Sequence, residues 1–216
     1  MGMVFGRIAE ELPRHSIVSK HATYQIRRYE PSIAVQCDYS RGWGNSSDGT
    51  PFGSLARYIG VFSEPENVKR QPIAMTAPVL IDAGTEKHTM MFLLPASKYS
   101  SIDAAPKPSN VSHAATLHQQ PCVPVSNPIS SPRVRQPNVR LQTLPARLQA
   151  VRTFSGNLRP SKARSEMQLL LEDLKRDGWH VKTTSSGVEW QAAGYNAPFV
   201  IPFLKTNEVM ISVDEK

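Results

Sequence analysis

The sequence predicts an α+β protein that is built from two related halves. A pair of strands joined at a proline corner occurs twice, at residues 24–39 and 139–156. Each pair is followed by one amphipathic helix, then by an Ala-Pro segment and a final apolar strand. Because neither half could readily bury its own sheet, we expect the two to close together into one twisted sheet or open barrel, with a helix on each half.

Composition indicates one globular domain spanning residues 1–216. The chain is 40% hydrophobic and 20% charged, and 216 residues suffice for a substantial core. The net charge of +7 could suggest nucleic acid, but the basic residues are scattered and no aromatic residues are interleaved with them, so we expect no nucleic-acid partner. Cys37 and Cys122 have no metal-ligand spacing. No stretch approaches the roughly 18 apolar residues of a membrane span, and the first residues do not resemble a leader. We therefore expect a cytoplasmic protein, and a monomer.

The first half opens with an N-terminal arm, residues 1–23, that contributes a few apolar side chains. Two strands are expected next, Tyr24–Tyr29 and Ser32–Tyr39, joined at Glu30-Pro31. In the second strand, apolar side chains alternate with small or polar ones, which is typical of a strand buried on one face. The apolar positions are Ile33, Val35 and Cys37.

A first helix is predicted between Thr50, a good N-cap, and the stop at Ser63-Glu64-Pro65. Pro51 suits the first helical position. Its apolar side chains fall on one face: Phe52, Leu55, Ile59 and Phe62. Two interpretations of this face stay open, since it would serve equally well to cover a sheet or to form an apolar wall with Arg57 at its rim.

The segment Pro72–Leu80, PIAMTAPVL, is the most unusual part of the first half. Proline is excluded from central strands and tolerated at edges and bulges, so the two prolines predict a kinked edge that lines something. A plain strand-turn-strand connection is the alternative. The following strand, TMMFLLP, is so uniformly apolar that we expect it to be buried on both faces.

A proline-rich insert separates the halves. Residues 112–138 hold five of the 18 prolines and no acidic residue or lysine. This composition predicts a disordered surface insert, residues 111–138, within the single domain.

The second half repeats the order of the first. A helix from about Ser161 to Arg176 is expected to end at Gly178. A hairpin is expected from Trp179–Thr183 and Val188–Ala192. The segment Ala193–Phe203 then echoes the earlier Ala-Pro segment, and Asn207–Val213 forms the last strand.

Six motifs in this order resemble the SOUL/haem-binding protein family: YQIRRYEP, PIAMTAPV, MFLLP, FSG, GYNAP and NEVMISV. The start MGMVFG and the IGVF-x-x-PEN stretch are most similar to its plant cytosolic members. The resemblance implies a distorted antiparallel β-barrel from two pseudo-symmetric halves, flanked by two helices. It also implies non-covalent, reversible binding of haem or another tetrapyrrole, as a carrier or buffer.

A porphyrin is a flat apolar disc with two carboxylates at one edge, so its site needs an apolar slot with cations at the mouth. One wall is expected on the first helix: Phe52, Leu55, Ala56 and Ile59, with Arg57 near the rim. The resemblance implies an opposite wall after the second Ala-Pro: Phe199, Val200, Ile201 and Phe203, with Lys205 as a propionate partner. None of the six histidines falls in these walls, so no iron ligand is assigned.

We expect no enzyme, because the chain has no G-x-S-x-G, H-E-x-x-H, P-loop or dinucleotide motif. Two alternatives to tetrapyrrole binding stay open. One is a protein-interaction module. The other is a small-molecule hydrolase, because the fold also resembles bacterial small-molecule-binding domains, a few of which are hydrolases that use glutamate and tyrosine. Glu189 with Tyr195, or Glu208, could imitate that arrangement.

Overall fold

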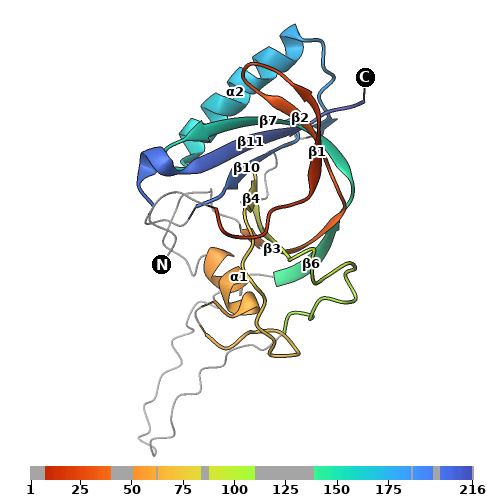
Figure 1. The fold of residues 1–216 in the computed structure, drawn as a ribbon, viewed down its shortest axis with the longest axis vertical. Coiled ribbons are helices and arrows are strands. Elements are labelled where there is room, and N and C mark those ends of the chain that lie inside the picture. Colours follow the sequence, from red (N-terminus) through yellow and green to blue (C-terminus); the bar gives the residue numbers. More distant parts are fainter. Residues whose placement is uncertain are drawn as a thin grey trace, which may run out of the picture.

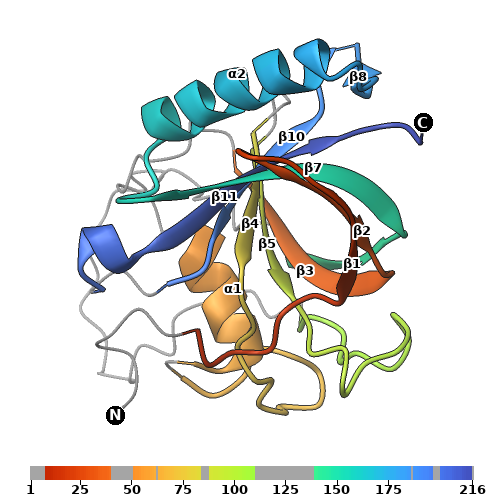
Figure 2. The same ribbon diagram turned by 45° about the horizontal axis from the view of Figure 1, so that its top comes forward.

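The computed structural model describes residues 8–39, 51–61, 63–83, 88–109, 139–185, 187–196 and 200–215 (Figure 1). Within these ranges, nine antiparallel strands form one curled sheet, a half-barrel, and two helices pack on its outer side (Figure 2). The helices are α1 (Pro51–Ile59) and α2 (Pro160–Arg176). The strands are β1 (His15–Lys20), β2 (Gln25–Tyr29), β3 (Ser32–Tyr39), β4 (Val79–Asp82), β5 (His88–Leu93), β6 (Val139–Leu144), β7 (Arg147–Ser155), β10 (Trp190–Gly194) and β11 (Thr206–Ser212).

The order of the strands confirms the predicted two-fold repeat. The sheet runs β1-β2-β7-β11-β10-β4-β5-β3-β6. Without β1, this order reads as a palindrome of the two halves, in which β2, β3, β4 and β5 correspond to β6, β7, β10 and β11. The halves meet where β4 pairs with β10. They also exchange their first strands, because β2 pairs with β7 and β6 pairs with β3.

Three groups of buried side chains hold the sheet and the helices together. One lies between α2 and the sheet and includes Leu170, Leu174, Ala150 and Val209. A second lies between α1 and β3 and β5 and includes Leu55, Ile59, Val35 and Phe92. The third lines the inner face of the half-barrel, opposite both helices; it includes Tyr29, Ala34, Leu80, Met91, Leu93, Val151, Ala193 and Met210.

Helix α2 forms where the sequence predicts it. Pro160 stands in its first turn, and its buried residues recur at helical spacing on the face toward the sheet. These are Ala163, Met167, Leu170 and Leu174. Gly178 follows with φ +69, a left-handed conformation that glycine adopts without strain, so the predicted stop is confirmed.

Helix α1 ends earlier than predicted, at Ile59 rather than near Ser63. Gly60 terminates it with φ +82, and its amide donates to the carbonyls of Ala56 and Arg57. A Cβ at Gly60 would lie 2.5 Å from Cγ of Pro65, so the turn depends on glycine for space as well as conformation. Thr50, the predicted N-cap, and Phe62 lie outside the described residues.

Strand β1 lies within the predicted N-terminal arm, residues 1–23, where the sequence analysis identified no strand. The strand pairs with β2 at the edge of the sheet, with an irregularity between Ile17 and Ser19. Its side chains are almost all exposed, so they show none of the alternation that indicates a strand in a sequence.

The prediction that Pro72–Leu80 is an edge segment is wrong. Both prolines precede β4, which starts at Val79 and lies inside the sheet between β10 and β5. The Ala77-Pro78 peptide is cis. By contrast, β5 is buried on both faces as expected, because Met91 and Leu93 face the interior while Phe92 packs toward α1.

The hairpin predicted for Trp179–Ala192 is much shorter in the structure. Only β8 (Thr183–Thr184) and β9 (Gly187–Val188) pair there, whereas β10 joins the main sheet. The β7 and β11 strands occur where they were expected. The predicted insert, residues 111–138, lies outside the described residues. In the described part of the chain, neither helix has the length and apolar character needed to cross a bilayer.

Candidate functional site

The predicted helix wall is largely turned toward the sheet. Leu55, Ala56 and Ile59 are buried and belong to the core between α1 and strands β3 and β5. Phe52, in the first turn of α1, is half-buried, and its ring packs edge-on against Phe92 with centroids 5.1 Å apart. Of this wall, Phe52 therefore keeps the most side-chain surface at the edge of the core, and the other three anchor the helix beneath it.

The predicted opposite wall lies around η1 (Pro202–Leu204), a short 3-10 turn between β10 and β11. Val200 is buried, but Ile201 is 46% exposed and Phe203 is 72% exposed. The turn is fixed to the end of β7, because the Gly156 amide donates to the Pro202 carbonyl at 3.0 Å. In Figures 1 and 2, η1 and α1 lie on the same side of the molecule. Phe199 lies outside the described residues.

The two predicted rim cations have different surroundings. The Arg57 Nε lies 3.2 Å from Oε1 of Glu66, and its Nη2 donates to Ser54 Oγ at 3.1 Å. A ligand carboxylate at Arg57 would therefore compete with Glu66. The Lys205 Nζ donates to the amide oxygen of Asn157 at 3.1 Å, and Lys205 is the residue that directly follows η1. Lys205 is thus the cation that follows directly on the exposed apolar wall.

None of the described histidines belongs to α1 or η1. His15 on β1 packs against the Tyr29 ring, and His21 stacks on Tyr24 with ring centroids 4.3 Å apart. His88 opens β5, and His180 precedes β8. Among the described residues, no group of three or more His, Cys, Asp or Glu side chains is arranged to hold a metal ion. His113 and His118 lie outside the described residues.

A second polar arrangement surrounds Glu208 on the inner face of the half-barrel. This residue is only 4% exposed. Its carboxylate accepts hydrogen bonds from Tyr195 Oη at 2.5 Å and Thr153 Oγ1 at 3.1 Å, and Arg27 Nη1 lies 3.0 Å from Oε1. Both carboxylate oxygens are therefore occupied by donors from three strands or strand ends.

The electrostatics of this group favour a fixed structural role. Burial, together with the charge of Glu208, raises the pKa of Tyr195 far above its ordinary value, so the hydroxyl remains a donor. Burial likewise raises the pKa of Tyr29. Burial opposes the charge on Arg27 and is the largest single influence, but Glu208 together with Tyr29 and Tyr195 outweighs it, so the pKa of the Arg27 guanidinium is raised.

The structure pairs Tyr195 with Glu208, one of the two arrangements that the sequence suggested, whereas Glu189 is exposed just before β10. Sequence analysis missed Arg27 and Thr153. A polar residue at an inward position of a strand is the signal that could have pointed to Arg27. Its contact with Glu208 follows only once β2, β7 and β11 are placed in register.

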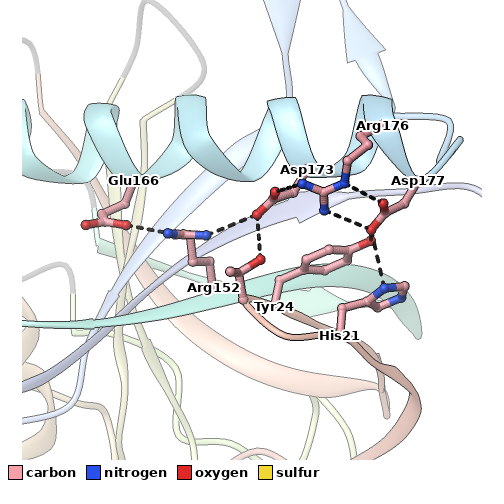
Figure 3. A network of polar contacts seen from close by, with 8 residues as sticks. His21, Tyr24, Arg152, Glu166, Asp173, Arg176 and Asp177 are labelled. Atoms are coloured by element: carbon pink, nitrogen blue, oxygen red, sulfur yellow. Dashed lines mark hydrogen bonds and ion pairs between the residues drawn. The ribbon is translucent and has the colours of Figure 1, made fainter.

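A third network joins the end of α2 to the sheet (Figure 3). Arg152 lies between Glu166 at 2.8 Å and Asp173 at 3.1 Å, and Asp173 also accepts from Thr23 at 2.6 Å. Asp177 accepts from Tyr24 at 2.6 Å and lies 3.3 Å from His21. These contacts connect α2 to β7 and to the loop before β2. The network therefore anchors the helix to the sheet.

Comparison with known folds agrees with this architecture. The C-terminal domain of EcmrR covers 89% of this chain and 99% of its own at 10% identity, with a TM-score of 0.52. An uncharacterized conserved protein and a hydrolase, both from Listeria innocua, cover 91% of this chain and 94% of their own. Their identities are 9% and 8% and their TM-scores 0.52 and 0.50. At such identities these likenesses show the fold alone.

Comparison with protein families goes further. No curated protein matches the chain in sequence. The sequence model of the SOUL heme-binding protein family matches it in two segments, residues 10–125 and 122–212. These segments hold both halves of the sheet, both helices and the exposed turn η1. The chain belongs to the SOUL heme-binding protein family.

Proposed function

We propose that the protein binds haem and related tetrapyrroles non-covalently and reversibly, as a carrier or buffer. The observation that carries the proposal is the family match, which extends over both halves of the sheet. The described surface supports it with exposed apolar side chains at η1, because Phe203 and Ile201 expose 72% and 46% of their surface to water. Covering such side chains with a flat apolar ligand is favourable by about 25 cal/mol per Å² of apolar surface.

The proposed site uses the residues that the sequence singled out. Phe52 on α1 faces the ligand from one side, with Leu55, Ala56 and Ile59 as the base beneath it. Ile201 and Phe203 face it from the other side, with the buried Val200 behind them; Phe199, also singled out by the sequence, lies outside the described residues. Lys205 and Arg57 would hold the two propionates through charge-assisted hydrogen bonds. Bound haem would supply a conjugated disc whose absorption reports its surroundings.

The proposal does not depend on an iron ligand. Of the described histidines, none lies on α1 or η1. Burial of the disc and contacts with its propionates would then provide the affinity, and metal-free porphyrin would bind as well as haem. This makes relative affinity for the two ligands a direct test of the binding mode.

A titration of the full chain with hemin and with protoporphyrin tests the proposal, using the Soret band and tryptophan quenching as readouts. We expect saturable binding of both ligands. Phe203→Ala should weaken both by about tenfold, which is about 1.4 kcal/mol and in the range of one lost aromatic contact. Its thermal stability should stay unchanged because the side chain is exposed. Leu169→Ala on α2, a residue 41% exposed, is the matched control and should bind as the wild type does.

One outcome would contradict this function, and a second would contradict only its proposed binding mode. If the wild type binds neither hemin nor protoporphyrin, tetrapyrrole binding is excluded as its function and a protein-interaction module is favoured. Binding of hemin alone would contradict the mode without an iron ligand and would return attention to the histidines.

A hydrolase is the second candidate, favoured by the hydrogen bond between Tyr195 and Glu208. A structurally similar protein from Listeria innocua is described as a hydrolase, at 8% identity. Against this candidate, Arg27 and Thr153 already occupy the carboxylate that would have to act as a base. Hydrolysis of p-nitrophenyl acetate that is lost in Glu208→Gln but not in Phe203→Ala would favour the hydrolase over the carrier.

A further inference from the structure

The inner face of the half-barrel carries several buried polar atoms whose hydrogen-bonding capacity is not used. Residues paired across antiparallel strands point to the same face, so the register identifies the inward side chains. In the described part of the chain, Ser32, Arg147, Gln149 and Gln191 each have such an atom without a hydrogen-bond partner. All four occupy inward positions, opposite Leu144, Tyr29, Arg27 and Met210 respectively. Tyr99, on the α1 side, is a further residue with an unused buried oxygen.

Of these residues, Arg147 loses the most free energy by burial, because both its Nε and its Nη1 are buried without a hydrogen-bond partner. Its guanidinium lies over the Tyr29 ring, with Cζ 5.3 Å from the ring centroid. Burial lowers the pKa of Arg147. Arg27 contacts the same tyrosine through its hydroxyl, at 3.3 Å, but its charge is matched by Glu208. Two guanidiniums therefore lie around Tyr29, and the Glu208 carboxylate is paired with that of Arg27.

Gln149 adds a buried acceptor on the same strand as Arg147. It is 2% exposed, and its Oε1 has no partner. It lies two residues from Arg147 on the same strand and is paired across the sheet with Arg27 and Ser212. In proteins, buried polar groups of this kind are almost always satisfied, and an unsatisfied cluster points to a bound ion, molecule or water.

A pocket opens at one edge of this face, next to the N-terminal arm. It is small and open to solvent, and it lies between residues 11–14 and the corner from Glu30 to Ser32. Its lining includes Ser32 and Leu93, which both belong to the inner face. Tyr29, on which Arg147 packs, is the residue immediately before Glu30.

We propose that the interior of the half-barrel is a second binding site, separate from the proposed tetrapyrrole site, for a small oxyanion that also donates a hydrogen bond. Hydrogen phosphate and hydroxycarboxylates share this chemistry. The anion pairs with the free guanidinium nitrogens of Arg147, the strongest kind of hydrogen bond available to it. The donor group of the ligand bonds to Oε1 of Gln149. The inference does not rest on tetrapyrrole binding, because no residue of α1 or η1 takes part.

The test uses calorimetric titration of the full chain with inorganic phosphate and with glycolate, compared with chloride at equal ionic strength. Four proteins are needed: the wild type, Arg147→Met, Gln149→Leu and Arg28→Met. Arg28 is the control, because it is an exposed β2 arginine paired with Glu215. We expect saturable binding of at least one anion by the wild type and by Arg28→Met. Binding should be at least tenfold weaker in Arg147→Met and severalfold weaker in Gln149→Leu.

Thermal denaturation in chloride provides a second readout, which distinguishes a variant that has lost the anion site from one that has failed to fold. Arg147→Met keeps most of the apolar contact with Tyr29 while it removes a buried unpaired charge, so its melting temperature should equal or exceed that of the wild type. Hemin titration of the same variant should be unchanged. The proposal is overturned if the wild type binds neither anion, if Arg147→Met binds as tightly as the wild type, or if Arg147→Met loses hemin binding, since the two sites would then be one.

Discussion

The hydroxyl of Tyr195 donates a 2.5 Å hydrogen bond to Glu208, and the same carboxylate lies 3.0 Å from Arg27. Tyr195 follows β10 and Glu208 stands on β11, both in the second half, whereas Arg27 comes from β2 in the first. One buried carboxylate therefore ties together segments from both halves, at a place where water does not compete for it.

Removing this carboxylate should cost more than removing its tyrosine partner. Glu208→Ala leaves Arg27 buried without its counter-charge, and breaking such a pair costs about 3–5 kcal/mol. Tyr195→Phe removes one hydrogen bond from a carboxylate that keeps Arg27 and Thr153, so about 1–2 kcal/mol is expected. Urea unfolding of both variants measures the difference. Equal losses in the free energy of unfolding would show that the ion pair between Arg27 and Glu208 contributes little to stability.

Stability in acid should depend on Asp177, near the C-terminal end of α2. Hydrogen bonds from Arg176 first, and then from Tyr24, lower the pKa of Asp177 from 3.8 to about 2. A carboxyl with a lowered pKa in the folded state contributes stability above its unfolded pKa, and the contribution is lost as the pH falls toward the folded value. The loss should therefore occur between about pH 4 and pH 2.

Asp177→Asn removes the titrating group and should flatten this part of the pH profile, as measured by urea unfolding at several pH values. Asp173 and Glu166 also have lowered pKa values, so some acid dependence should remain. An acid profile of Asp177→Asn identical to that of the wild type would contradict the assignment.

Gly60 should tolerate alanine less well than another glycine of positive φ. Both Gly60 and Gly187 have left-handed backbones, with φ +82 and +113, which cost a residue with a Cβ about 1–2 kcal/mol. A Cβ at Gly187 meets open space, whereas one at Gly60 would lie 2.5 Å from Pro65. Thermal denaturation should show a larger loss for Gly60→Ala than for Gly187→Ala. Equal losses would mean that Pro65 moves aside at no cost.

Deletion of Val111–Asn138 should leave the fold and hemin binding intact. The two family matches meet at residues 122–125, inside this segment, and the described sheet contains no residue of it. The melting temperature and the hemin titration of the shortened chain are the measurements. Binding only by the shortened chain would identify the segment as a cover over the site, and loss of folding would contradict its being an insert.

Most of the fold was predictable because its elements carry periodic apolar residues. Strand β3 begins and ends as predicted, and α2 differs by one residue at its start. Strand β1 was not predictable, because an edge strand with exposed Ile17 and Val18 has no buried face to produce alternation. The interior position of β4 was missed because the nearby prolines precede the strand rather than interrupt it.

The candidate site was less predictable for a related reason. Periodicity shows that Leu55 and Ile59 lie on an apolar face, but it does not show whether that face meets a sheet or a ligand. The exposed side chain of Phe203 cannot be recognised from a sequence in which every phenylalanine counts as apolar. The unpaired nitrogens of Arg147 are visible only once the strands are placed in register.

The exchange of first strands between the halves has a consequence for a cut chain. Strand β2 of the first half pairs with β7 of the second, and β6 of the second half pairs with β3 of the first. Each half therefore contributes one strand to the sheet of the other. Cleavage between residues 110 and 138 would leave two fragments, each lacking a partner for one of its own strands. Such fragments should reassemble when mixed, as the two parts of a split protein do, and neither should be stable by itself.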